Sequence, residues 1–277
     1  MTSLRRLFRR KVNVVALAVI LGWVVLAVLA STIAPHDPTE TVGRSRQPPS
    51  PLFWFGTDQL GRDIFSRVLQ GARISLPLGV VTVIVGAIPG TLLGLFAGYF
   101  GGVVDTLISR FVDALLAFPS ILLTLVVIAA LGPSLRNVII AVAVAMIPEY
   151  ARLVRSSVLV IRGLAYVEAA RALGASNLRI MFVEVLINAS GPILVMSTLQ
   201  VGQAILVGAG LSFLGLGPPP PTPEWGLMSA EGQEFLRRAW WMSTFPGLAI
   251  LSLVIAFNLF GDGVKSVLDP KLGRGRG

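Results

Sequence analysis

The sequence contains no cysteine and only one histidine. A chain without cysteine forms no disulfide and offers no thiolate to a metal or a lipid. This excludes a disulfide-stapled secreted domain, a lipoprotein and a thiolate metal site. The single histidine, His36, lies in the turn-rich segment 34–38, Ala-Pro-His-Asp-Pro. A serine–histidine dyad or a multi-histidine metal centre would need that imidazole inside the folded body, so we expect no catalytic and no metal-ligating residue.

Lysine is also scarce, since Lys11, Lys265 and Lys271 are the only three among 277 residues. None of them stands in the frame Gly-x4-Gly-Lys-Ser/Thr, the loop whose backbone amides and lysine hold nucleotide phosphates. The chain therefore has no phosphate cradle of this kind and cannot hydrolyse ATP by that route. We expect it to be no enzyme and to bind no cofactor itself.

Apolar residues dominate instead, with 54% hydrophobic residues, 13% charged residues and a mean hydropathy of +0.79. These values lie far outside the usage of soluble globular proteins and indicate a bilayer as the solvent. We expect an all-α polytopic membrane protein in which a single six-span domain, residues 12–277, follows a cytoplasmic amino end, residues 1–11. The expected spans are 12–34, 75–99, 111–131, 138–159, 185–211 and 244–260.

The first apolar run has a rival interpretation as a cleaved signal peptide, but it is too long for one and more spans follow it.

The basic flank of the first apolar run also sets the orientation. The segments 1–11, 100–110, 151–184 and 261–277 carry 15 of the 23 lysines and arginines, which predicts that both termini are cytoplasmic. The net charge of +9 then reflects topology and attraction to anionic lipid headgroups. It does not indicate nucleic acid, because no platform of aromatic and basic residues accompanies it.

Several residues in or near the spans are polar. The fourth apolar run is the weakest candidate for a span, because the stretch from Val138 to Pro148 is too short to cross a membrane alone. We therefore expect protein to shield that helix at one end. Glu149 and Arg152 are three residues apart and can pair on one helix face, whereas Asp113 near the inner interface is expected to be solvated. Tryptophans 225, 240 and 241 in the loop 212–243 suit a membrane interface.

The fifth run contains Ser197, Gln200 and Gln203 at three-residue steps, on one arc of a helix. These side chains are candidates for lining a passage through the membrane. Polar side chains of this kind also hold helices together without touching a cargo, and Gly202, with Gly208 and Gly210, points to tight packing as well. Both interpretations stay open.

The loop 160–184 is the most informative segment. Its alanine-rich stretch from Ala165 to Leu173 favours a short helix, in which Glu168 can pair with Arg171. Gly174 can supply the left-handed stop of this helix, and Ser176 can cap the next one. A helix this short is marginal alone, so it should dock into something, and its small side chains let another protein approach the backbone closely.

These residues resemble a known family. The Glu168-Ala169-Ala170 triplet followed by Gly174 is similar to the EAA loop of permease subunits of bacterial ABC importers. Nearly the whole chain is similar to the second, C-type permease of dipeptide, oligopeptide and nickel importers. The matching motifs are residues 34–38, 55–58, 60–63, 71–75, 112–119, 258–263 and 268–270.

The resemblance implies the type I ABC importer permease fold and a set of partners. These are a homologous second permease, one or two ABC ATPase subunits that bind ATP and Mg, an extracytoplasmic substrate-binding protein, and membrane lipid. The coupling helix that contacts the ATPase would use Tyr166, Glu168, Ala169, Ala170, Arg171 and Gly174. ATPase closure would then drive alternating access in the cell membrane, with di- or oligopeptides as the first choice of cargo and nickel chelates, glutathione or other small solutes behind them.

One segment departs from the family pattern. Val183-Glu184 and Leu186-Ile187-Asn188 stand where the family usually has an Arg-His pair and then Leu-Pro-Asn, which puts the start of the fifth span in doubt. Outside this family, a secondary transporter or a channel would also consist of apolar helices, and an intramembrane enzyme is a further alternative. The acids here lie near the expected span ends, however, and a docking helix has no purpose in a self-sufficient carrier.

Overall fold

The computed structural model describes residues 10–268, and that part of the chain is almost entirely helical. The helices are α2 (Lys11–Ile33), α3 (Ile64–Phe100), α4 (Gly102–Leu116), α5 (Ser120–Leu131), α6 (Leu135–Ile161), α7 (Ala165–Ala172), α8 (Asn177–Arg179), η1 (Ile180–Val185), α9 (Leu186–Phe213), α10 (Trp225–Gln233) and α11 (Trp241–Leu268). Within the described residues the only β pairing is an isolated bridge between Thr57 and Asp63. The all-α prediction is confirmed. Residues 1–9 of the predicted amino end, and residues 269 and 270 of one motif, lie outside the described residues.

By length and hydropathy, five helices in the described residues are able to cross a membrane: α2, α3, α6, the continuous helix Asn177–Phe213 and α11. The third predicted run, 111–131, is not one helix. It is divided between α4 and α5, which meet at 90° and together provide a sixth candidate span. The break falls at residues 117–119, where Pro119 has no N–H to continue the helix that ends at Leu116.

The fourth predicted span is an unbroken helix, α6, that passes through Pro148. Half of its most apolar window is buried inside the protein, the largest share among the five candidate spans. The expected protein shielding therefore exists, and α3 provides most of it. The missing N–H of Pro148 interrupts one backbone hydrogen bond without ending the helix, because packing on a neighbour holds it in place.

A stripe of glycines at every fourth position of α3 explains this close packing. The stripe consists of Gly86, Gly90, Gly94 and Gly98. A Cβ atom on Gly90 would lie 2.6 Å from the carbonyl oxygen of Ile147, and one on Gly86 would lie 2.8 Å from that of Ala143. The two backbones therefore approach each other as small-residue stripes allow in membranes. Among the glycines of the fifth span, Gly208 packs on Leu78, whereas Gly210 faces open space.

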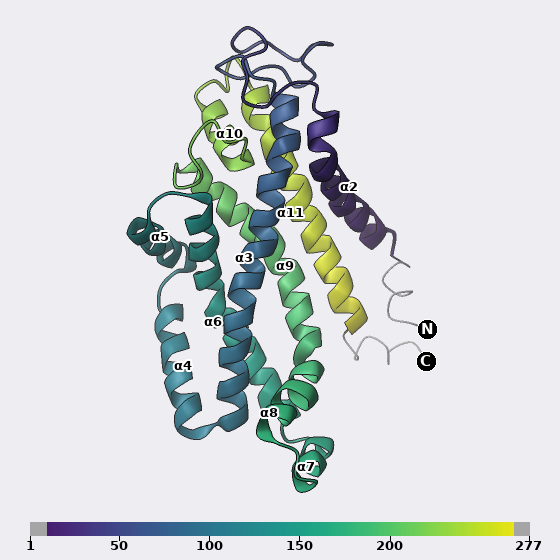
Figure 1. Ribbon diagram of the computed structural model, residues 1–277, viewed down its shortest axis with the longest axis vertical. Coiled ribbons are helices and arrows are strands. Elements are labelled where there is room, and N and C mark those ends of the chain that lie inside the picture. Colours follow the sequence, from purple (N-terminus) through teal and green to yellow (C-terminus); the bar gives the residue numbers. More distant parts are fainter. Residues whose placement is uncertain (1–9, 269–277) are drawn as a thin grey trace.

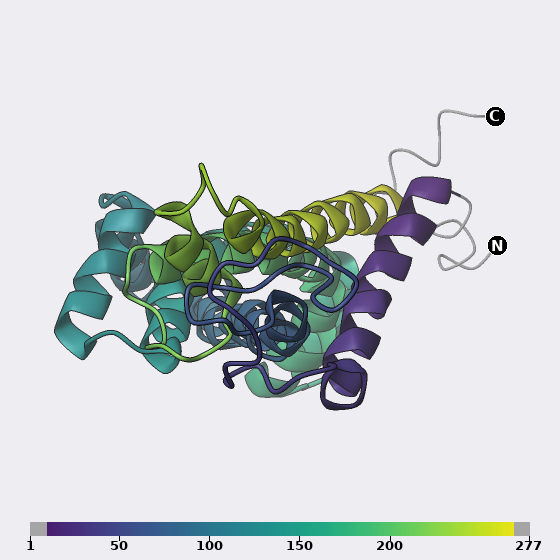
Figure 2. The ribbon, with the colours of Figure 1, turned by 90° about the horizontal axis from the view of Figure 1, so that it is seen from above.

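The helices α3, α6, α9 and α11 form the body of the molecule, with α2 on one flank and α4 and α5 on the opposite flank (Figures 1 and 2). The segment 34–63 and α10 cover one end of this body, and α7 protrudes from the other end (Figure 1). The α3 helix begins at Ile64, eleven residues before the predicted span, because Asp63 caps it by accepting a hydrogen bond of 3.0 Å from the backbone N–H of Ser66.

The covered end is held by buried charges and indoles. Arg62 Nε lies 2.5 Å from Asp58 Oδ2, and Arg67 Nη2 lies 3.4 Å from Glu231 Oε2. Two of the three tryptophans in the loop 212–243 pack inside the protein. Trp225 and Trp241 are 0% and 6% exposed, and their indole N–H groups donate to the backbone carbonyls of Val68 and Thr57.

Candidate functional site

The helix α7 forms where the alanine-rich stretch predicts it, from Ala165 to Ala172. It is attached to the body through Val167, which is completely buried. Val167 packs in a cluster with side chains of α3, α6, η1 and the residues around them: Leu95, Tyr99, Val154, Val158, Ile180, Met181 and Val185. The short helix is therefore a surface element that is fixed to α3, α6 and η1.

The opposite face of α7 is open. Tyr166, Glu168, Ala169 and Arg171 are exposed, whereas Ala170 is half-buried against the body. Just after the helix, Leu173 is 88% exposed, more than any other large apolar side chain of the described residues. The sequence-based set of coupling residues omits Leu173, although an apolar side chain next to a helix stop is the signal that identifies it.

The corner after α7 has the predicted geometry. Gly174 has a positive φ of 81°, and the N–H of Ala175 reaches back to the carbonyl of Ala170 at 3.1 Å, which completes a Schellman motif. Ser176 then caps the next helix by accepting from the N–H of Arg179. The predicted pair between Glu168 and Arg171 is not among the ion pairs of the described residues.

Within the segment that departs from the family pattern, Val183 and Glu184 lie in the π-helix η1, and residues 186–188 begin α9. Both elements belong to a continuous helix that runs from Asn177 to Phe213. The fifth span therefore leaves the corner without a break. Tyr166, on α7, also contacts this segment, since its hydroxyl donates to the carbonyl of Glu184 at 3.4 Å.

A polar pocket of about 210 Å³ lies between α5, α6 and α9. Its lining consists of Ser120, Ile121, Thr124, Val142, Ala145, Met146, Glu149, Gln200, Gln203 and Val207. Two of the three candidate passage residues, Gln200 and Gln203, are thus brought together here. The third, Ser197, lies one turn away and accepts a hydrogen bond of 3.1 Å from the hydroxyl of Tyr150.

The predicted pair between Glu149 and Arg152 does not form. Glu149 Oε2 instead accepts a hydrogen bond of 2.6 Å from the side-chain amide of Gln200, and Arg152 pairs with Asp113 at 3.0 Å. Asp113 is therefore engaged in an ion pair and not simply solvated. Spacing along α6 permits the predicted pair, but groups from α9 and α4 offer better geometry to each partner.

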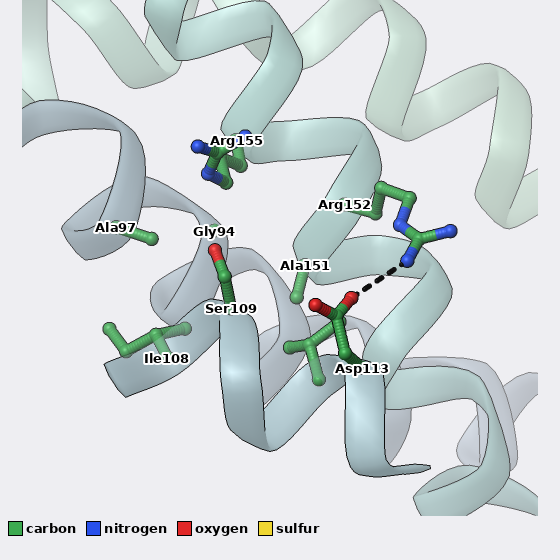
Figure 3. A pocket seen from close by; sticks show the side chains of 9 residues that line it. Gly94, Ala97, Ile108, Ser109, Asp113, Ala151, Arg152 and Arg155 are labelled. Atoms are coloured by element: carbon green, nitrogen blue, oxygen red, sulfur yellow. Dashed lines mark hydrogen bonds and ion pairs between the residues drawn. The ribbon is translucent and has the colours of Figure 1, made fainter. Parts of the chain in front are cut away.

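A second pocket, of about 350 Å³, lies between α3, α4 and α6 (Figure 3). Arg152 and Arg155 of α6 project toward it and hold α4 by its carboxylates. Arg155 makes the stronger, bidentate contact with Asp105, in which Nε donates to Oδ1 at 2.5 Å and Nη2 donates to Oδ2 at 2.6 Å. Val112 is the buried residue of α4, and the two ion pairs add polar contacts between α4 and α6.

Comparison with known families identifies the chain. The family described as "binding-protein-dependent transport system inner membrane component" matches residues 90–274, well over half of the chain. The chain belongs to this family. Residues 2–49 of this inner-membrane component also match the N-terminal transmembrane domain of oligopeptide transport permease C.

Curated relatives agree with this membership. The inner-membrane component is 45% identical over 271 residues to the dipeptide transport system permease protein of Alkalihalophilus pseudofirmus, covering 98% of this chain and 89% of the relative. It is 47% identical over 270 residues to the glutathione transport system permease protein of Escherichia coli, covering 97% and 89%. It is 47% identical over 253 residues to the di/tripeptide transport system permease protein of Pseudomonas aeruginosa, covering 89% and 84%.

Solved structures support the fold. A chain of the MetNI methionine ABC transporter in inward-facing conformations matches with a TM-score of 0.58 at 20% identity, covering 73% of this chain and 96% of that chain. A chain of an amino acid ABC transporter matches with a TM-score of 0.55 at 16% identity, covering 72% and 92%. The ABC importer permease fold predicted from the sequence is thereby confirmed.

Proposed function

We propose that this chain is a permease subunit of an ATP-driven importer that takes up di- or oligopeptides. A homologous second permease would complete the translocation path, and separate ATPase subunits would bind and hydrolyse ATP with Mg. An extracytoplasmic binding protein would deliver the cargo to the end covered by residues 34–63 and α10. Both termini and α7 would lie on the cytoplasmic side, as the distribution of lysine and arginine indicates.

The observation that carries this proposal is the construction of α7. It is a short helix with one buried anchor, Val167, an open face of small residues around Ala169, and a bare apolar side chain, Leu173, beside it. A surface that faces only water is not stabilised by a bare apolar side chain beside small residues. The same arrangement suits a groove in a partner protein, because small side chains allow close approach and an apolar anchor fills a pocket. The names of the relatives support peptides as the cargo class.

Force applied to α7 would reach the body through the buried cluster around Val167 and through the continuous helix that starts at Asn177. The backbones of α3 and α6 approach closely along the glycine stripe, so these two helices would move together. ATPase closure would thus shift a rigid unit and not a single loop, as alternating access requires.

Copurification and transport test this proposal together. The tagged chain, expressed with the second permease, ATPases and binding protein of its own importer, should copurify with the ATPases and support ATP-dependent uptake of Ala-Ala in proteoliposomes. Uptake by this chain alone without ATP would instead establish a secondary transporter. Copurification and ATP-driven uptake that accepts another solute class but no peptide would overturn the cargo while leaving the importer standing.

A further inference from the structure

Glu149 occupies an unusual position for a carboxylate. It lies 14 residues from the start of α6 and 12 from its end, and its partner Gln200 lies 13 residues before the end of the continuous helix Asn177–Phe213. At about 1.5 Å per residue, Glu149 stands roughly 20 Å from either end of a helix that is long and apolar enough to span a membrane. An ionisable group at this depth is costly unless it meets a partner or a water-filled passage.

The described residues 10–268 offer Glu149 no counter-charge. None of the ion pairs in this part of the chain includes it, and its hydrogen-bond partner, Gln200, is a neutral amide. The two acids of α4 behave differently. Asp105 and Asp113 on α4 are each paired with an arginine of α6. The expectation that the acids lie near the span ends is therefore wrong for Glu149, whose carboxyl group lies in the middle of α6 and has no cationic partner among the described residues.

The surroundings of Glu149 have the properties of a binding site. Its side chain is exposed to the polar pocket between α5, α6 and α9, beside Gln200, Gln203 and Ser120. The side-chain amide of Gln200 donates to Oε2 of Glu149 at 2.6 Å, which fixes the carboxyl group at the edge of this pocket. Amide and hydroxyl groups around a carboxylate suit an ammonium group, which needs acceptors on several sides.

We propose that Glu149 receives a cationic group of the cargo, such as the terminal ammonium of a peptide, as it crosses the middle of the membrane. This rests on the proposed function and adds to it a preference for positively charged cargo groups within the permease itself. Gln200 positions the carboxylate, and Gln203 supplies a neutral acceptor on the same helix face one turn further along α9.

Thiol modification tests the electrostatic effect of Glu149 in the pocket without requiring transport. The chain has no native cysteine, so a single introduced cysteine is the only thiol of this chain that reacts. A cysteine introduced by Gln203→Cys in the permease pair is treated with aminoethyl or sulfonatoethyl methanethiosulfonate, which carry opposite charges. The ratio of cationic to anionic reaction rates should fall about tenfold when Glu149→Gln is added. At the exposed control position, Gln233→Cys, the same change should leave the ratio unaltered. An unchanged ratio in the pocket would mean that Glu149 is neutralised by a proton or by the second permease, and would overturn the inference.

Uptake of Ala-Ala by the complete importer tests the role in transport. Glu149→Gln should lower uptake about tenfold while stimulation of the ATPase by loaded binding protein persists, whereas Glu149→Asp should keep most of the uptake. Moving the charge within the pocket, in the double variant Glu149→Gln with Gln203→Glu, should restore part of it. Full uptake by Glu149→Gln would refute the cargo contact. Failure of the unaltered importer to take up Ala-Ala would instead count against the proposed function, and the thiol ratio would still decide the charge of the pocket.

Discussion

The hydroxyl of Tyr99 donates a hydrogen bond of 2.8 Å to Oδ1 of Asn177, which joins the end of α3 directly to the first residue of α8. Tyr99 is 8% exposed and also belongs to the cluster that anchors Val167. The long helix that packs along α6 therefore contacts both sides of the Gly174 corner. In the proposed importer this hydrogen bond ties α3 to the helix that follows the ATPase-facing element α7.

Replacing Tyr99 with phenylalanine should weaken that link while keeping the ring in the cluster. A hydrogen bond of this kind contributes about 1 kcal/mol, so stimulation of the ATPase by loaded binding protein should fall two- to fivefold, roughly, with assembly unchanged. Tyr166→Phe is the matched control. Its hydroxyl makes a longer, exposed contact of 3.4 Å with the carbonyl of Glu184, and its loss should have little effect on stimulation. Equal effects of the two changes would deny Tyr99 a special role.

The small and apolar positions on the open face of α7 should tolerate no added charge. Ala169→Asp and Leu173→Asp each place a carboxylate where the proposed ATPase groove would close, and should reduce copurification of the ATPase at least about tenfold. Ala172→Asp tests the neighbouring exposed position, and its effect maps how far the contact extends. Ala170 is a poorer probe, because it is half-buried against the body and a large substituent there would disturb α7 itself. Undiminished copurification by both main variants would place the ATPase contact elsewhere.

The orientation is open to a labelling experiment on single cysteines. Gln233 and Arg179 are both exposed and lie near opposite ends of the body. In intact cells, Gln233→Cys should react with a membrane-impermeant maleimide, and Arg179→Cys should react only after permeabilisation. Labelling of Arg179→Cys in sealed cells would reverse the proposed topology.

Packing of α3 on α6 predicts a sharp difference between two glycines. A methyl group on Gly90 would meet the carbonyl oxygen of Ile147 and Cβ of Tyr150, both at 2.6 Å, whereas one on Gly22 of α2 has nothing within 4 Å. Gly90→Ala should therefore destabilise the protein by about 1–3 kcal/mol through overpacking, seen as a lower thermal midpoint in detergent. Gly22→Ala should leave the midpoint unchanged or raise it. Equal midpoints would show that the two backbones can separate at no cost.

The features that sequence alone predicted are local ones. The stop at Gly174 and the cap at Ser176 depend on residues next to each other in the chain, so their types suffice. The apolar runs likewise identify most spans. The 90° turn between α4 and α5 was missed because Pro119 signals that a helix ends but not the direction in which the chain continues.

The partners of polar side chains could not be predicted in the same way. Glu149 and Arg152 are well spaced for each other, yet their actual partners lie 51 and 39 residues away along the chain, on α9 and α4. Which helix lies beside which is decided by the packing of the whole body, above all by the glycine stripe of α3. The unpaired state of Glu149, on which the cargo proposal depends, is therefore visible only in three dimensions.

The corner at Gly174 allows a test in which steric crowding plays no part. A Cβ atom on this glycine would meet nothing within 4 Å, so only its positive φ of 81° opposes a larger residue. Alanine in this left-handed region costs about 1 kcal/mol, and a β-branched valine costs more, on the order of 2 kcal/mol. Gly174→Val should therefore open the Schellman turn and misdirect α7 more than Gly174→Ala does. The spans form independently of this turn, so both variants should reach the membrane in normal amounts. Stimulation of the ATPase by loaded binding protein should decrease in the order Gly, Ala, Val, and identical stimulation by all three would show that the coupling geometry is set somewhere other than this corner.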